Sequence, residues 1–227
     1  MSALENVRRA LVIAPHPDDE ILGCGGTIAR LCAAGVEVHV AIVTRGKPPR
    51  FDAAHVRRVE EEARAAHDFL GVTRSHFLDF PAAGLDQVSH AEINGGIAKL
   101  VQEIDPDTLF LPFIGDVHVD HQLIFTSGMV AARPRASHYP RRVYAYETLS
   151  ETNWYAPGVT PAFQPNMFVD ISGFLPQKLE AFGLYRSQVQ AFPNERSVEA
   201  LRALAMLRGS TVHREAAEAF VLLRELA

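Results

Sequence analysis

The sequence has few cysteines, no long apolar run and no excess of positive charge. Cys24 and Cys32 are its only cysteines, and their spacing fits neither a disulfide framework nor a zinc ribbon. The longest early apolar run, residues 10–14, is about a quarter of a membrane span and shorter than a signal-peptide core. A net charge of −5 disfavours binding to nucleic acid. We therefore expect a cytoplasmic protein that has no membrane span and acts on a small molecule.

Apolar and charged residues make up 48% and 22% of the 227 residues, the range of a globular protein. Residues 10–14 (ALVIA) are typical of a parallel strand buried on both faces. A helical pattern over 19–34 and an apolar run over 36–44 follow, which is the order of a βαβ unit. Further strands are expected at 77–80, 108–111, 142–148 and 167–171, and further helices at 54–70, 90–104, 176–188 and 197–208.

This alternation predicts an α/β protein, a Rossmann-like three-layer sandwich with a mostly parallel central sheet. The length and the lack of a linker favour a single domain over 1–227.

The first strand leads into a cluster of ionisable residues, His16, Asp18, Asp19 and Glu20. Aspartate is a common helix cap, and acids near a helix N-terminus are stabilising. Capping explains one of the two aspartates but leaves the other and His16 unexplained. Ligands bind at the carboxyl ends of parallel strands, so this cluster is a candidate site.

A second cluster, His118, Asp120 and His121, follows the expected strand at 108–111. If both strands belong to one parallel sheet, the two clusters face the same crevice. Catalytic zinc is commonly held by three nitrogen and oxygen ligands with one position open. Such a metal activates water, while a carboxylate that is not a ligand accepts the proton. The sequence therefore predicts a hydrolytic metal site.

Both clusters resemble the signatures of the PIG-L or LmbE-like deacetylase family: APHPDDE at 14–20, GCGGT at 23–27 and HVDH at 118–121. Matching flanks include TRG at 44–46, YRSQ at 185–188 and AEAF at 217–220. The resemblance implies a zinc-dependent hydrolase that removes an acyl group, typically acetyl, from an amino sugar or related amine. Another divalent cation, such as Fe²⁺, would also suit these ligands.

The resemblance also implies residue roles. The metal ligands would be His16, Asp19 and His121. Asp18 matches the general base, and His118 matches the group that stabilises the oxyanion or protonates the leaving amine. Asp120 matches the carboxylate that orients a histidine.

Other residues are weaker candidates. Arg58 and Asn166 are predicted substrate contacts, and Trp154 with Tyr155 could form a wall for a sugar ring. Cys24 is expected to pack in the core, and Glu218 to support the site indirectly. The remaining histidines, His67 and His76 among them, show no paired spacing with acids.

Two alternative functions stay open. The same metal site could hydrate a small unsaturated acid, because a metal-activated water does not dictate which bond is broken. The second alternative is a noncatalytic binding module with a structural metal. Structural metal sites usually have four protein ligands, whereas three are predicted here. The sequence is also compatible with a homo-oligomer.

Overall fold

The centre of the fold is one seven-stranded sheet. The computed structural model describes residues 4, 6–135, 138–154, 156 and 158–226. The strands are β1 (Arg9–Ala14), β2 (Glu37–Arg45), β3 (Arg74–Pro81), β4 (Thr108–Pro112), β5 (Arg142–Tyr146), β6 (Met167–Asp170) and β7 (Ala217–Glu225). Their order is β3-β2-β1-β4-β5-β7-β6, and β7 runs antiparallel to both of its neighbours.

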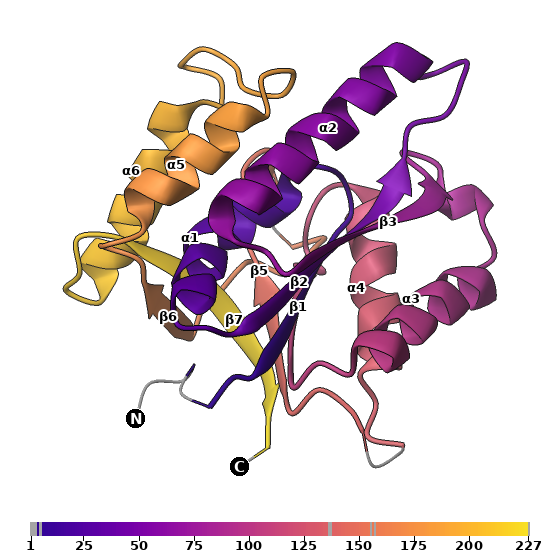
Figure 1. Ribbon diagram of the computed structural model, residues 1–227, viewed down its shortest axis with the longest axis horizontal. Coiled ribbons are helices and arrows are strands. Elements are labelled where there is room, and N and C mark those ends of the chain that lie inside the picture. Colours follow the sequence, from indigo (N-terminus) through magenta and orange to yellow (C-terminus); the bar gives the residue numbers. More distant parts are fainter. Residues whose placement is uncertain (1–3, 5, 136–137, 155, 157, 227) are drawn as a thin grey trace.

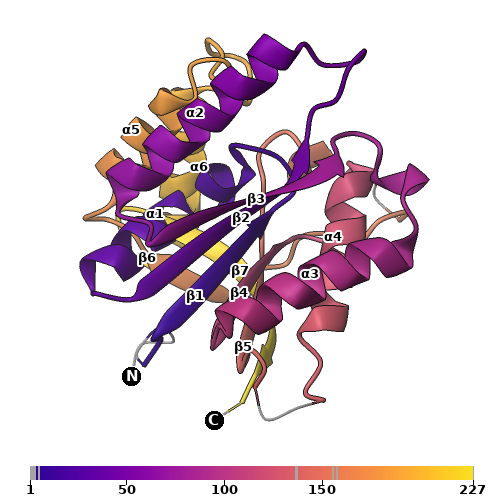
Figure 2. The ribbon, with the colours of Figure 1, turned by 45° about the vertical axis from the view of Figure 1, so that its right-hand side comes forward.

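Helices cover both faces of this sheet (Figures 1 and 2). One layer contains α1 (Asp19–Ala33), α2 (Ala53–Leu70), α5 (Leu175–Leu184) and α6 (Val198–Thr211). The other contains α3 (His90–Ile104) and α4 (Val119–Ala131). Two short 3₁₀ helices, η1 (Leu85–Gln87) and η2 (Thr152–Trp154), lie in connecting segments. The predicted three-layer α/β fold with a mostly parallel sheet is confirmed.

The apolar run of β1 explains its central place. Val12 and Ala14 belong to the core beneath α1, whereas Leu11 and Ile13 belong to the core beneath α3 and α4. Successive side chains of a strand point to opposite faces, so a strand covered on both sides must be apolar throughout. This burial fixes β1 between β2 and β4.

Glycines let α1 approach the sheet closely. A Cβ atom at Gly23 would lie 2.2 Å from the ring of Tyr146, and one at Gly26 would lie 2.7 Å from Ile171. The Tyr146 hydroxyl donates to the carbonyl oxygen of Ile13 in β1, which holds this ring in place. The glycine-rich start of α1 thus sets the position of the residues just before it.

Several expected boundaries were wrong. β3 begins at Arg74 rather than at 77, β5 ends at Tyr146 rather than at 148, and α5 ends at Leu184 rather than at 188. The C-terminal segment forms β7, which inserts between β5 and β6. Among the described residues, no helix combines the length and apolar character that crossing a membrane requires.

Candidate metal centre

The topology brings the two ionisable clusters together. β1 and β4 are neighbours in the sheet and run parallel, so the segments after them start at the same edge. His16 and Asp19 follow β1 at the start of α1, and His121 follows β4 in the first turn of α4. His16 Nε2 lies 3.0 Å from Asp120 Oδ2, across 104 positions of sequence. The predicted convergence is confirmed.

Three side chains form a compact set of donors. The ligand atoms of His16, Asp19 and His121 all lie within 4.8 Å of one another. His121 Nε2 is 3.2 Å from Asp19 Oδ2, and both side chains are fully buried. In the described part of the chain, neither His121 Nε2 nor Asp19 Oδ1 has a hydrogen-bond partner. Buried polar atoms are normally paired, so these unpaired nitrogen and oxygen atoms fit a divalent metal.

A second set, His16, His118 and Asp120, is also close enough to hold an ion. Its carboxylate is already engaged, because Asp120 accepts hydrogen bonds from the backbone nitrogens of Ala83 and Leu85. The set around Asp19 is therefore the better metal site.

Each histidine of this site is oriented by a carboxylate. His121 Nδ1 lies 2.8 Å from Asp116 Oδ2, which leaves Nε2 facing Asp19. His16 Nε2 lies 3.0 Å from Asp120, which leaves Nδ1 3.4 Å from Asp19 Oδ2. Metal-binding histidines typically bond a carboxylate through the ring nitrogen that does not face the metal. Asp120 orients His16 and not His118, whose Nδ1 is 4.0 Å away.

Asp18 lies beside these donors in an unusual conformation. Its φ of 102° is in the left-handed region, and its side chain makes no capping hydrogen bond to α1, which excludes simple helix capping. Oδ2 is 3.2 Å from Arg196 Nη1, while Oδ1 has no partner among the described atoms. Burial raises the pKa of Asp18 well above its usual value, although the charge of Arg196 opposes this.

Glu20 holds the backbone of Asp18. Its Oε2 accepts a hydrogen bond from Asp18 N at 3.2 Å. Its Oε1 accepts a hydrogen bond from the Tyr185 hydroxyl at 2.5 Å and lies 3.2 Å from His67 Nε2. All of these side chains are fully buried. His67 shows no paired spacing with acids in the sequence, and its acidic partner Glu20 comes from α1, 47 positions away.

His118 forms one wall of the site. Its Nδ1 accepts a hydrogen bond from Asp120 N at 3.1 Å and so caps α4. Its ring lies 4.7 Å from that of His16, centroid to centroid. Burial and the neighbouring charge of His16 lower the pKa of His118 from its usual value. The ring can offer a hydrogen bond toward a group bound in the pocket.

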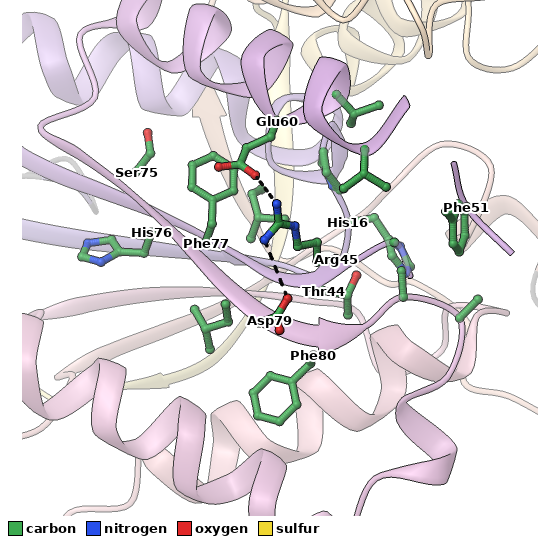
Figure 3. Close-up of a pocket in the computed structure, with 18 of the residues that line it drawn as sticks. His16, Thr44, Arg45, Phe51, Glu60, Ser75, His76, Phe77, Asp79 and Phe80 are labelled. Carbon is green, nitrogen blue, oxygen red and sulfur yellow. Dashed lines mark ion pairs between the residues drawn. The ribbon is translucent and has the colours of Figure 1, made fainter. Parts of the chain in front are cut away.

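A pocket of about 900 Å³ begins at this centre. His16, His118, Glu151 and Arg196 line the pocket at this centre. From there it follows β3 between α2 and α3, and Figure 3 shows Arg45 in the middle, between Glu60 and Asp79. This volume is typical of small-molecule sites.

Two charged residues that line this pocket had no recognisable pattern in the sequence. Arg196 comes from the segment between α5 and α6, and Glu151 follows β5. Glu151 is 8% exposed, and burial raises its pKa to about 7. Asp116, the partner of His121, was also missed, although an acid five positions before a candidate ligand was a usable signal.

The structure places the predicted substrate contacts elsewhere. Arg58 is exposed on α2, which contributes Glu60 and Arg64 to the pocket instead. Asn166 is exposed, and its side chain accepts a hydrogen bond from Leu222 N in β7. Trp154 is 62% exposed and donates to Glu195, whereas Tyr155 lies outside the described residues.

Two further predictions concern α1. Cys24 is fully buried, and burial raises the pKa of its thiol well above the usual value, which confirms a packing role. Glu218 accepts hydrogen bonds from the backbone nitrogens of Gly26 and Thr27 and pairs with Lys178. It therefore braces the helix that begins with Asp19.

The fold is a three-layer α/β sandwich with a candidate metal centre at the carboxyl ends of β1 and β4. Residues 11–132 match the PIG-L family, described as GlcNAc-PI de-N-acetylase, and the chain belongs to this family. Diacetylchitobiose deacetylase of Thermococcus kodakarensis is 32% identical over 201 residues, covering 84% of this chain and 72% of its own length.

Two other proteins are comparably similar. The Bacillus cereus protein named "Probable N-acetyl-alpha-D-glucosaminyl L-malate deacetylase 2" is 30% identical, covering 81% of this chain and 85% of its own. The crystal structure of the conserved protein TT1542 from Thermus thermophilus superimposes with a TM-score of 0.78 at 30% identity, covering 96% of each chain.

Proposed function

We propose that this protein is a zinc-dependent N-deacetylase that hydrolyses the linear amide of an N-acetylated amino sugar or sugar-like amine. The observation that carries the proposal is the meeting of His16, Asp19 and His121, in which His121 Nε2 and Asp19 Oδ1 are buried and have no hydrogen-bond partner among the described residues. The Thermococcus kodakarensis and Bacillus cereus relatives are named as a diacetylchitobiose deacetylase and a probable N-acetyl-alpha-D-glucosaminyl L-malate deacetylase, which supports this substrate class.

His16, Asp19 and His121 would hold the metal. When bound, zinc polarises the acyl oxygen and makes water acidic enough to be activated near neutral pH. The chain provides three neutral or anionic donors, which would leave a coordination position for water or substrate, as in catalytic zinc sites.

Asp18 acts as the general base. Its Oδ1 accepts a proton from the water as the water oxygen attacks the acyl carbon, and Arg196 retains Oδ2. His118 donates a hydrogen bond to the oxyanion that forms. The C–N bond then breaks, the amine takes the proton that Asp18 received, and acetate is released.

Acetate release from N-acetylglucosamine and N,N′-diacetylchitobiose tests the proposal. Protein loaded with zinc should release acetate and a free amine, and protein stripped by a chelator should not. An Asp18→Asn variant should bind zinc but lose activity by about 10²- to 10⁴-fold. Acetate release measured after loading with Fe²⁺ under anaerobic conditions compares the activity that the two metals support.

The alternatives predict different results. A hydratase would consume a small unsaturated acid without releasing acetate, and a noncatalytic binding module would bind metal without turnover. Zinc-loaded protein that releases no acetate from any N-acetylated sugar or amine would contradict the proposal.

A further inference from the structure

Arg196 reaches the centre of the site from a distant part of the chain. It lies between α5 and α6, 178 positions from Asp18 in the sequence, yet its Nη1 is 3.2 Å from Asp18 Oδ2. Its side chain is 25% exposed and lines the pocket. The guanidinium therefore faces both the buried aspartate and the space that receives the substrate.

The position of Arg196 is fixed by its surroundings. Its Nε donates to Ser150 Oγ at 2.8 Å, and its Nη2 lies 3.8 Å from Glu151. The backbone is held as well, since Arg196 N donates to Asn194 Oδ1. A guanidinium donates in a rigid planar fork, so these contacts fix the direction of the Nη1 donor.

The contact with Asp18 makes the two oxygens of this carboxylate different. Oδ2 is engaged by Arg196, whereas Oδ1 has no partner within the described atoms. Glu20 restrains the backbone of Asp18, but its contact is to the peptide nitrogen and does not fix the side chain. A general base must lie within hydrogen-bond reach of the proton that it accepts, so the carboxylate needs a separate restraint.

We infer that Arg196 is a positioning residue for the deacetylation, which holds Oδ2 of Asp18 so that Oδ1 is kept ready for the proton of the attacking water. This inference rests on the proposed role of Asp18 as the base. Arg196 acts through Asp18 and requires no bond to the substrate. Its loss should therefore lower kcat more than it changes KM.

Three variants of the zinc-loaded protein test the inference, with N,N′-diacetylchitobiose as the substrate probe. Arg196→Gln should lower kcat by about 10- to 100-fold while zinc content and melting temperature stay as in the unmodified protein. Arg196→Lys keeps a cation near Asp18 and should retain more activity than Arg196→Gln. Arg202→Gln, the same change at an exposed arginine of α6, should have no effect.

Unchanged kcat in Arg196→Gln would overturn the inference, and so would a raised KM with unchanged kcat, which would make Arg196 a substrate contact. If the unmodified protein releases no acetate, the proposed function fails separately. Crystal structures of the unmodified protein and Arg196→Gln then decide the positioning role. A displaced Asp18 carboxylate in the variant would support it, and an unchanged one would overturn it.

Discussion

Asp116 and His121 form a buried pair in which Asp116 Oδ2 lies 2.8 Å from His121 Nδ1. The other oxygen of Asp116 accepts a hydrogen bond from the Thr152 hydroxyl at 2.6 Å, so the carboxylate cannot turn away. The pair orients His121 Nε2 toward Asp19, 3.2 Å away. Asp116, which is not among the three proposed metal ligands, thus fixes the direction of the His121 ring, which is one of them.

Replacing Asp116 by Asn should weaken zinc binding by about 10- to 100-fold, because partners of metal-binding histidines typically contribute that much. Competition with a chromophoric chelator measures this affinity. The matched control is Asp86→Asn, since Asp86 is exposed in η1 and should leave the affinity unchanged. Equal zinc affinities for the two variants would show that Asp116 does not support the ligand.

His121 and His118 should respond differently to replacement by Ala. His121→Ala removes a buried ligand, so zinc content after dialysis should fall sharply and activity should be lost with it. His118→Ala should keep its zinc but lose about 10²- to 10³-fold in kcat, because it removes a donor to the oxyanion. Metal analysis together with acetate release distinguishes the variants. Loss of zinc from both would mean that His118 is itself a ligand.

Tyr185→Phe should destabilise the fold by about 1–3 kcal/mol, because it removes a hydrogen bond from the buried acceptor Glu20. Denaturant unfolding measures this change in the free energy of unfolding. Tyr139→Phe is the control, since Tyr139 is only partly buried and lies far from Glu20 in the sequence. A Tyr185→Phe variant as stable as this control would show that the hydrogen bond between Tyr185 and Glu20 contributes little to the free energy of unfolding.

His76 should make the free energy of unfolding decrease in mild acid. Burial, followed by the charges of His39 and Arg74, lowers its pKa from 6.5 to about 4. Between these values the unfolded chain takes up a proton that the folded chain does not, so stability falls as the pH drops from 6.5 toward 4. Above pH 6.5 neither state is protonated, and this contribution vanishes.

Unfolding measured across this range should show a flatter pH dependence for His76→Gln than for the unmodified protein. His90→Gln, at an exposed histidine at the start of α3, should leave the pH dependence as it was. If His76→Gln gives the same slope as the unmodified protein, the lowered pKa of His76 is not a source of acid sensitivity.

Patterns local in the sequence predicted much of this molecule. The apolar run of β1 indicated a strand buried on both faces, and the topology of such strands brought His16 and His121 to one edge. β7 was harder, because the C-terminal segment could be read as a helix or a strand until its pairing with β5 and β6 is known.

Other contacts between distant segments could not be predicted, because they do not follow from the order of parallel strands. Asp18 meets Arg196, and Glu20 meets His67, only because separate loops and helices converge on the start of α1. Arg58 was predicted to contact substrate, but it is not among the residues that line the pocket. It lies next to the buried Val59 on α2 but faces solvent, because adjacent positions of a helix point about 100° apart. Its position in the sequence alone therefore did not show which face of α2 it occupies.

Anomalous diffraction at the zinc edge, from crystals of the zinc-loaded protein, tests the metal centre most directly. One ion should appear, bound by a nitrogen of His16, an oxygen of Asp19 and Nε2 of His121, with a water completing the coordination. An ion bound elsewhere, or enclosed by four protein ligands with no position for water, would contradict the proposed catalytic metal site.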